Sequence, residues 1–452
     1  MAVVTDKLKK QVISFIQNDF DSDANYYIGI GRSEDWNDSD IAPTTLRSKR
    51  EERNFRNGLQ SVKKVIDTSF VVPRFNWSSG AIYSPYDDAQ VGYPSQSYYV
   101  LNDNNQVYMV IEQAKNTDGT AKVSTVQPSG NTSGTAFQTA DGYIWKFLYS
   151  ISALDANKFV AANFMPVKLA TAADSDAAGV EQLAVQNAAV VGQIIGVAVD
   201  SGGTGYTGTP TVTITGDGTD AKFSATIDGG VVTKCEVIDS SGTLAFGSGY
   251  TNAVATLSTS GSTIPAKVRP IFATPLGLGG DARDDLKSTS FMFHVKPDGT
   301  ENNDFIVGND FRQVGLIKGI KDSAGVNDFS GSTGIALKKL TFASQTSNFT
   351  VDKTIEGATS GAKALIDRVD SANALFFHQT EVTGFVGFDS GENITEVDGT
   401  GAGTLTTPSA GQLPFTTPEV LVNTGDVLYI DNRASVSRAT DQTEDIKVVI
   451  QI

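Results

Sequence analysis

The residues best suited to acid–base or metal chemistry are few in this chain and lie far apart. Its 452 residues include two histidines, His294 and His378, and one cysteine, Cys235. This set does not supply the usual ligands of a zinc site, and it leaves no spare base for a Ser-His or Cys-His nucleophile. Each histidine is flanked by aromatic residues in a strand-like run, so we interpret both as structural. We interpret Cys235 as a small buried apolar residue in a protein without disulfides.

Acidic residues are abundant, but their spacing does not favour a catalytic pair. A glycosidase would need two carboxylates about 5 to 9 Å apart across a sugar. Asp87-Asp88 and Asp284-Asp285 are adjacent in sequence, and neighbouring residues of a strand point to opposite faces. The runs 102–105 and 217–220 could offer oxygen ligands to calcium, but neither matches an EF-hand loop, and we interpret both as turns. We therefore expect no catalytic, cofactor-binding or metal site.

A glycine-rich run, Gly203-Thr-Gly-Tyr-Thr-Gly208, matches the G-x-G-x-x-G pattern of dinucleotide sites. In such a site the loop must open a helix whose N-terminus holds the pyrophosphate. Here the residues that follow, Thr209-Pro-Thr-Val-Thr-Ile-Thr215, are typical of a strand. The pattern therefore predicts a turn within β structure and no cofactor.

The composition favours a soluble, mainly β protein. The chain has 51 acidic and 35 basic residues, a net charge of −16, whereas nucleic-acid binding needs clustered basic residues. No apolar run approaches the ~20 residues of a membrane span, and the first residues lack the apolar segment of a signal peptide. The 44 glycines, with many Thr, Ser, Asp and Asn, are typical of short strands joined by tight turns. We expect a protein that folds in the cytoplasm, with neither nucleic-acid binding nor membrane insertion.

Two helices are predicted near the start of the chain. The first covers 6–18, where apolar residues recur at helical spacing. The second covers 46–66, where Phe55, Leu59 and Val62 follow one another at steps of four and three residues. The remaining faces of this second helix are mostly basic. We interpret them as solvated, with docking against an acidic partner surface as the alternative.

The end of the chain predicts two strands. Residues 446–452 alternate between apolar and other side chains, the pattern of a strand buried on one face. An apolar run at 427–430 precedes it, and the loop between the two carries Arg433 and Arg438. We expect the last strand to close a core sheet that begins at residues 27–30.

Two internal stretches differ from the rest because turn glycines alternate there with short Thr- and Val-rich runs. In the first, the surroundings of Tyr206 are echoed around Tyr250, each after a Gly-x-Gly turn. Two copies are too few for a solenoid, so a compact β module is the better interpretation. We predict a mainly β, multi-domain, β-sandwich-like core with a few N-terminal helices and two inserted β modules. The expected divisions are 1–189 (core), 190–265 (module), 266–348 (core), 349–410 (module) and 411–452 (core).

The chain resembles a baseplate wedge subunit of contractile T-even-type phages, the gene product eight family. Five segments carry the resemblance, in the same order as in the family, over roughly 1–189, 266–348 and 411–452. They are Ile28-Gly-Ile-Gly-Arg-Ser-Glu-Asp-Trp36; Val72-Pro-Arg-Phe-Asn-Trp77 with Tyr83-Ser-Pro-Tyr86; Asp141-Gly-Tyr-Ile-Trp-Lys-Phe-Leu-Tyr149; Asp310-Phe-Arg-Gln-Val-Gly-Leu-Ile317; and Gly425-Asp-x-x-Tyr429 with Asp431-Asn-Arg433 and Asp441-Gln-Thr-Glu444. The two modules are absent from the T-even subunit and resemble β modules of marine phage structural proteins.

The resemblance implies a non-enzymatic structural protein of the virion, located in the tail baseplate and assembled in the host cytoplasm. Such a subunit would form a homodimer and bind other baseplate wedge subunits, with tail-fibre attachment proteins as further partners. It would take part in the host-triggered rearrangement that leads to sheath contraction, which needs interfaces with two discrete packings. Candidate interface residues are Arg32, Trp36, Trp77, Arg433 and Arg438, because Trp and Arg often dominate interfaces.

Two functions of other classes stay open at this point. The first is a phage adhesin-like protein that binds host-surface glycan through its inserted modules, which would call for an exposed aromatic platform. The second is a polysaccharide-degrading enzyme, which would call for a carboxylate pair in a cleft.

Overall fold

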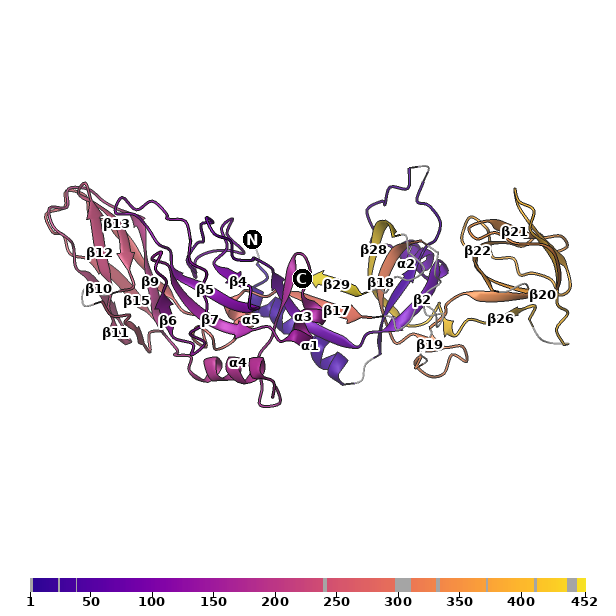
Figure 1. Cartoon of the computed structure of the whole chain (residues 1–452), viewed down its shortest axis with the longest axis horizontal. Helices are drawn as coiled ribbons and strands as arrows, with labels where there is room; N and C mark the ends of the chain where they lie inside the picture. The colour runs from indigo at the N-terminus through magenta and orange to yellow at the C-terminus, as the bar shows by residue number, and fades with distance from the viewer. Residues whose placement is uncertain are drawn as a thin grey trace. The chain divides into compact units, whose positions relative to one another are not determined.

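The computed structural model describes residues 3–22, 25–37, 39–238, 242–296, 310–330, 334–370, 373–409, 413–436 and 445–452. The protein is mainly β, with several separate sheets and few helices, which confirms the predicted fold class (Figure 1). The chain divides into two compact units, the first made of 1–14, 69–292 and 449–452 and the second of 15–68 and 293–448. No helix in the described ranges is long and apolar enough to cross a membrane.

The first unit contains most of the helices. Its elements, including those that continue into the second unit, are α1 (Asp6–Asp21), β3 (Asp67–Pro73), β4 (Tyr99–Leu101), β5 (Gln106–Glu112), β6 (Ala136–Gln138), β7 (Ile144–Ser150), α3 (Ala153–Phe159), β8 (Phe164–Val167), α4 (Ala177–Asn187), β9 (Ile194–Ser201), β10 (Val212–Gly216), β11 (Thr219–Ala221), β12 (Ser224–Asp228), β13 (Val231–Glu236), β14 (Phe246–Ser248), β15 (Ala253–Leu257), β16 (Lys267–Phe272), α5 (Ala282–Asp285), β17 (Ser290–Val295) and β29 (Ile446–Gln451).

An aromatic core holds the first unit together. The sheet β4-β5-β7-β6 buries Tyr108, Tyr143, Trp145 and Phe147 on a common cluster. Helix α4 contributes Val185 to this cluster and lies along β7 (Figure 1). Aromatic rings bury large apolar areas and prefer the tilted and edge-on packing seen here, for example 5.5 Å between the centroids of Tyr108 and Phe147.

Four two-stranded ribbons, β9–β16, β10–β15, β11–β14 and β12–β13, make up the region 194–272. The two sequence repeats meet here, because β10 after Tyr206 pairs antiparallel with β15 after Tyr250. The strand predicted to follow the G-x-G-x-x-G run is β10, so this run opens no helix. The first and last strands of the region, β9 and β16, are themselves paired.

The second unit consists of a four-stranded sheet and a larger inserted sheet. Its elements are β1 (Tyr26–Gly31), α2 (Lys49–Asn57), β2 (Leu59–Lys64), β18 (Phe311–Lys318), β19 (Lys321–Asp322), β20 (Lys338–Ser347), β21 (Thr354–Gly357), β22 (Lys363–Asp370), β23 (Ala374–His378), β24 (Asn393–Glu396), β25 (Ala402–Leu405), β26 (Phe415–Thr416), β27 (Val420–Leu421) and β28 (Asp426–Val436).

Two glycines allow α2 to lie against the sheet β2-β1-β18-β28. Gly29 of β1 and Gly315 of β18 are directly opposite each other in the antiparallel register. The buried ring of Phe55 from α2 lies over both, so close that a side chain at either position would meet it. These glycines belong to two segments of the resemblance, and their role is to make room for one aromatic ring.

The inserted sheet, β23-β22-β21-β24-β25-β20-β26, has its own hydrophobic core. That core includes Phe342, Phe349, Ile355 and Phe377, all buried. The first strand, β20, pairs with the last strand, β26, so the module begins and ends on neighbouring strands. Figure 1 labels β20, β21, β22 and β26 of this module.

Three sequence predictions need correction, and one of them concerns Arg433, which was expected in a loop but lies within β28. The second helix spans only Lys49–Asn57, and Leu59–Lys64 is a strand paired with β1. The apolar residues of 55–62 do reach one core, but the helix ends at Gly58. The strand that follows is buried on both faces. A short apolar run of this kind cannot be told from a buried helix by the spacing of its residues. The first helix is confirmed and extends to Asp21.

The terminal strand was placed in the wrong sheet. The strand β29 belongs to β29-β17-β3-β8, whereas β1 lies in β2-β1-β18-β28. The strand that closes the sheet of residues 27–30 is β28. Alternation of apolar side chains predicts which face of a strand is buried, but it carries no information about the neighbouring strand.

Candidate functional site

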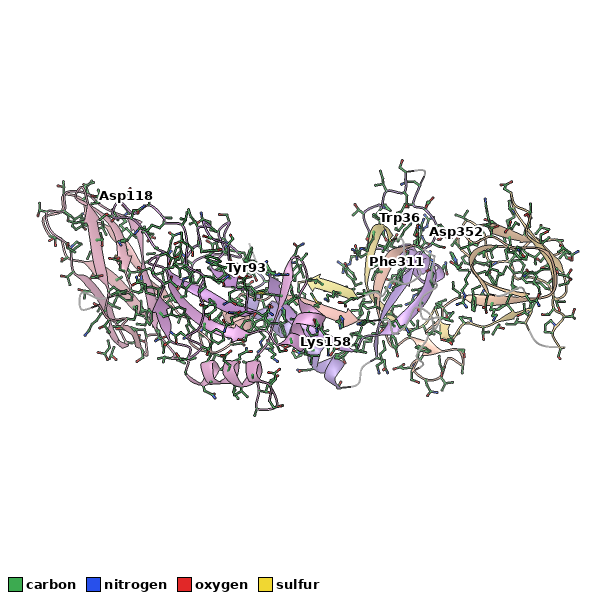
Figure 2. All side chains as sticks on the ribbon, viewed as in Figure 1. Trp36, Tyr93, Asp118, Lys158, Phe311 and Asp352 are labelled. Carbon is green, nitrogen blue, oxygen red and sulfur yellow. The ribbon has the colours of Figure 1, made fainter. Side chains whose placement is uncertain are left out.

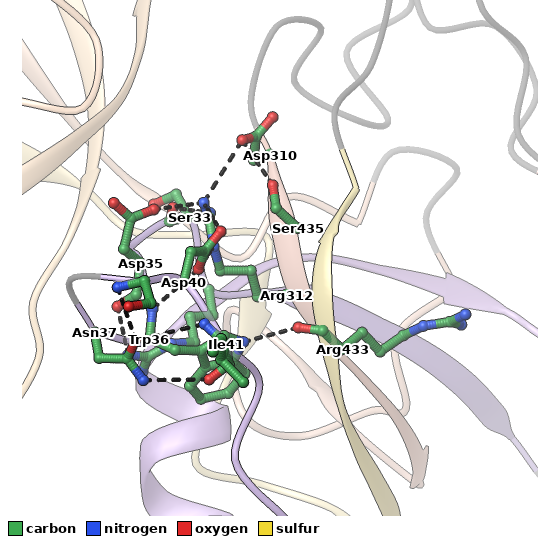
Figure 3. Close-up of polar contacts among 12 residues, drawn as sticks. Ser33, Asp35, Trp36, Asn37, Asp40, Ile41, Asp310, Arg312, Arg433 and Ser435 are labelled. Carbon is green, nitrogen blue, oxygen red and sulfur yellow. Dashed lines mark hydrogen bonds and ion pairs between the residues drawn. The ribbon is translucent and has the colours of Figure 1, made fainter.

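An ion cluster around Arg312 joins Ser33, Asp35 and Asp40 to β18 in the second unit (Figure 3). The Arg312 side chain is 5% exposed and donates from Nε to Asp40 Oδ1 at 2.7 Å and from Nη2 to Asp40 Oδ2 at 2.9 Å. The same Nη2 lies 2.5 Å from Asp35 Oδ1 and 3.6 Å from Asp310 Oδ2, and Nη1 donates to the carbonyl oxygen of Ser33. A buried guanidinium thus has charged partners on both of its edges, the geometry that suits arginine better than lysine.

The loop that supplies these carboxylates, residues 32–41, is held in a specific backbone conformation. Arg32 and Asp40 have φ values of 61° and 48°, in the left-handed region that favours glycine. The backbone N–H of Trp36 donates to Asp40 Oδ1 at 3.1 Å. The hydrogen bond from Arg312 lowers the pKa of the Asp40 carboxyl, so this group stays ionised.

Trp36 ties the same loop to β28. Its Nε1 donates to the carbonyl oxygen of Arg433 at 2.8 Å (Figure 3; Trp36 is also labelled in Figure 2). The Arg32 guanidinium carbon lies 4.0 Å from the centroid of the Trp36 ring. The Arg433 side chain points away and is 51% exposed, with Asp431 at 3.9 Å. Three segments of the resemblance, 28–36, 310–317 and 425–433, therefore contact one another.

A second buried ion cluster fastens the 32–41 loop to the inserted module. His378 Nδ1 lies 2.6 Å from Asp367 Oδ2, and His378 Nε2 lies 3.3 Å from Glu34 Oε1. Asp367 is fully buried and also accepts from Ser33 Oγ at 3.0 Å. Burial opposes the imidazolium, but Asp367 and then Glu34 outweigh it and raise the pKa of His378 to about 10. His378 is therefore a cation held between two carboxylates.

A cavity of about 480 Å³, called the junction pocket below, lies beside these two clusters. Its wall combines the 32–41 loop and α2 with strands and loops of the inserted module. Two of the residues that line it carry buried polar atoms without a hydrogen-bond partner, Nε of Arg32 and Oε2 of Glu34. The lining residues are Arg32, Glu34, Asp35, Trp36, Arg50, Asn54, Asn57, Gly58, Thr354, Leu365, Thr380, Glu381, Val382 and Thr383.

In the first unit, Trp77 and Asp141 bring two further segments of the resemblance together. Trp77 Nε1 donates to Ser124 Oγ at 3.0 Å, and Ser124 Oγ donates to Asp141 Oδ2 at 3.1 Å. The ring of Trp77 is partly buried against the cluster that contains Tyr83 and Trp145, whose centroids lie 5.7 Å apart. The Asp141 carboxylate also accepts from backbone N–H groups, so it acts as a structural hub.

Another cavity, of about 310 Å³, lies between β5 and the 194–272 region and brings acidic residues together. Asp87 receives two hydrogen bonds from Arg269, which lower its pKa. Glu112 Oε2 accepts from the backbone N–H of Val237 at 2.6 Å, and burial raises its pKa to about 7. Cys235 lines the same cavity, and burial raises the pKa of its thiol to about 12, so it is no thiolate nucleophile at neutral pH. The carboxylates of this cavity are engaged in structural contacts.

Glu112 should make the first unit less stable as the pH rises. Its pKa in the folded protein, about 7, lies above the ordinary value of 4.5. Its stabilising contribution is therefore complete below pH 4.5 and is lost as the pH rises through 7. Glu112→Gln retains the acceptor for Val237, so its urea-unfolding stability should vary less between pH 5 and pH 8 than that of the wild type. Glu181→Gln, on α4, is the control and should keep the wild-type dependence; an unchanged dependence in Glu112→Gln would contradict this assignment.

The predicted interface residues have different environments. Arg32, Trp36 and Arg433 are brought together around the 32–41 loop, Trp77 lies in the other unit, and Arg438 falls outside the described residues. The sequence analysis interpreted His378 as structural, in agreement with its place in a buried ion cluster, but it gave no role to Glu34, Asp40, Arg312 or Asp367. One signal was present, since Arg312 is a charged residue within a strand that is otherwise apolar or neutral up to Lys318.

A scan of the chain against protein-family models finds no match, and a search of curated proteins finds no relative. Within the part of the chain that the structure describes, no group of three or more His, Cys, Asp or Glu side chains could hold a metal ion. The 217–220 run is a bend at 217–218 followed by the start of β11, and Asp217 accepts from the backbone N–H groups of Thr251 and Asn252.

Proposed function

We propose that this chain is a structural protein of a contractile phage tail, a baseplate wedge subunit. In this role it assembles with itself as a homodimer and with other wedge subunits, and it takes part in the host-triggered rearrangement that leads to sheath contraction. The five-segment resemblance is the basis of the proposal. One structural observation supports it most: the matched residues contact one another although they lie hundreds of positions apart.

The contacts explain why those residue types occur in those segments. Gly29 and Gly315 make room for Phe55, Arg312 pairs with Asp35 and Asp40, and Trp36 reaches Arg433. Residues of this kind specify a framework, because each buried charge or close approach requires its partner. Residues matched only in exposed turns would need no such partners, so a match confined to them would say nothing about the framework. These contacts support the resemblance because its residues form the internal framework of this chain, and the function that we propose from it is mechanical rather than chemical.

The proposal can be tested at Arg433, the most exposed of the described interface candidates. Arg433→Glu should change the unfolding free energy by less than about 1 kcal/mol, because its side chain is 51% exposed and its ion pair with Asp431 is long, at 3.9 Å. Reversal of an interface charge should nevertheless weaken homodimer or wedge assembly by roughly ten-fold or more. Light scattering of the purified chain and co-purification with co-expressed tail proteins of the same phage measure this.

The matched control is Lys353→Glu, an exposed residue of the inserted module with the same change of charge. Assembly that is equally affected in both variants, or in neither, would remove Arg433 from the interface. The wedge proposal itself is tested by electron microscopy of purified virions. Density for this chain in the baseplate is the expected result, and density in the capsid would overturn the proposal.

The adhesin alternative is less well supported in the form that the sequence suggested. It called for an exposed aromatic platform in the first inserted module. Tyr206, Phe223 and Tyr250 are all buried there, and Phe246 is partly buried. These four rings stabilise the module and offer no platform for a sugar.

A further inference from the structure

We propose that the junction pocket binds a short, uncharged saccharide. The pocket, of about 480 Å³, is within the range of small-ligand sites. Its wall is shared by the 32–41 loop, α2 and the inserted module, so a ligand here would contact both parts of the second unit. The inference does not depend on the proposed function, since a wedge subunit with or without a sugar site would have the same framework.

Two lining residues offer hydrogen-bonding capacity that the protein itself does not use. Arg32 Nε is a donor and Glu34 Oε2 is an acceptor, and both atoms are buried without a hydrogen-bond partner. A buried polar atom of this kind is costly unless it finds a partner. A hydroxyl group donates and accepts through a single oxygen atom, so neighbouring hydroxyls on one sugar ring could satisfy Arg32 and Glu34 together.

The charges around the pocket are already balanced by the protein. Glu34 faces His378, Asp35 faces Arg312, and Arg50 Nη2 lies 2.7 Å from Glu381 Oε2. Arg32 also lines the pocket, and the charge of nearby Glu34 favours its guanidinium. An anionic ligand would therefore meet the Glu34 carboxylate as well as Arg32, and it would lose its hydration without full compensation. This argues against a phosphate or carboxylate ligand and in favour of a neutral one.

The other lining groups suit a sugar as well. Thr354, Thr380 and Thr383 supply hydroxyls and Asn54 and Asn57 supply amides, groups that accept and donate in the same way as a sugar. Trp36 adds an apolar ring surface, which suits the C–H face of a pyranose.

The conformation of Arg32 is a second, independent observation. Its φ of 61° is one that glycine adopts more easily, yet the position carries a long cationic side chain over Trp36. Replacing Arg32 with glycine should therefore leave the backbone fit intact while it removes the donor. If Arg32 serves a ligand site, this substitution should weaken ligand binding without lowering the Tm. If its role is purely structural, the substitution should lower the Tm.

The test is binding of the full-length chain to an array of neutral bacterial surface oligosaccharides and common neutral monosaccharides. Any hit is then titrated against the free chain by calorimetry and by the shift in Tm. We expect saturable binding by the wild type, at least ten-fold weaker binding by Arg32→Gly, and a Tm of the ligand-free variant no lower than that of the wild type. Asp398→Gly is the matched control, because it makes the same backbone change at an exposed left-handed residue outside the pocket and should bind like the wild type.

Asn54→Ala gives a second measurement if Arg32→Gly does not fold. Alanine is a good helix former, so α2 should tolerate the change while the pocket loses an amide. An array without any saccharide hit would overturn the proposal, as would binding that Arg32→Gly and Asn54→Ala leave unchanged. Neither result would bear on baseplate assembly, which the Arg433 experiment measures separately.

Discussion

Replacing Arg312 with methionine is expected to destabilise the second unit by about 3 kcal/mol or more. Methionine fills a similar volume, but it leaves Asp40 and Asp35 without the guanidinium that they contact at 2.5 to 2.9 Å. The lower end of the range for broken buried pairs applies, because Asp35 is 69% exposed and can regain water. Hydrogen exchange of the β1 and β18 amides measures this loss directly.

Two variants show whether the cluster has this importance. Arg312→Lys keeps the charge but not the two-pronged geometry, so it should recover only part of the lost stability. Arg433→Met removes an arginine of the same sheet whose side chain is half exposed, and it should cost less than about 1 kcal/mol. Equal losses in Arg312→Met and Arg433→Met would show that the cluster contributes no more than a surface ion pair.

The second large effect is expected at His378 and depends on pH. The folded pKa of about 10 lies above the ordinary value of 6.5. The stabilisation from the imidazolium is therefore complete below pH 6.5 and is lost progressively as the pH rises through 10. His378→Gln can still donate to Asp367 but cannot carry the charge. It should be destabilised most at pH 6, by roughly 3 kcal/mol as for one broken buried pair, and least near pH 10.

The measurement is the difference in unfolding free energy between wild type and His378→Gln across pH 6 to 10, taken from hydrogen exchange in β22 and β23. Tyrosine and lysine titrations occur in both proteins and cancel in this difference. His378→Leu removes the hydrogen bond as well and should be worse at every pH, because the fully buried Asp367 then loses both the charge and the donor at position 378. A difference that does not change with pH would mean that His378 is neutral in the folded protein.

The sequence predicts the fold class and the first helix well, because these depend on composition and on local periodicity. Prediction from the sequence fails where the same local pattern fits both a helix and a strand. Phe55, Leu59 and Val62 fit one helical stripe, but in the structure they divide between α2 and β2. Gly58 was the available signal, and the spacing of the apolar residues outweighed it.

The candidate site was harder to foresee, because its partners meet only through tertiary structure. Glu34 and His378 are 344 positions apart in the sequence, and nothing local marks either as half of an ion pair. Trp36 was identified from its residue type, whereas Arg312 was visible only as a lone charge in a strand. Residue types predict which side chains need partners, but not which partners they find.

Both inserted regions begin and end on paired antiparallel strands, β9 with β16 and β20 with β26. Each is therefore a closed loop whose two ends lie together, as in a domain inserted at a hairpin tip. The remainder of the chain has only a short gap to bridge when such a region is gained, lost or exchanged, and closing a short gap costs little chain entropy. The fold thus has two positions where evolution or an engineer could replace an entire module without changing the path of the rest of the chain.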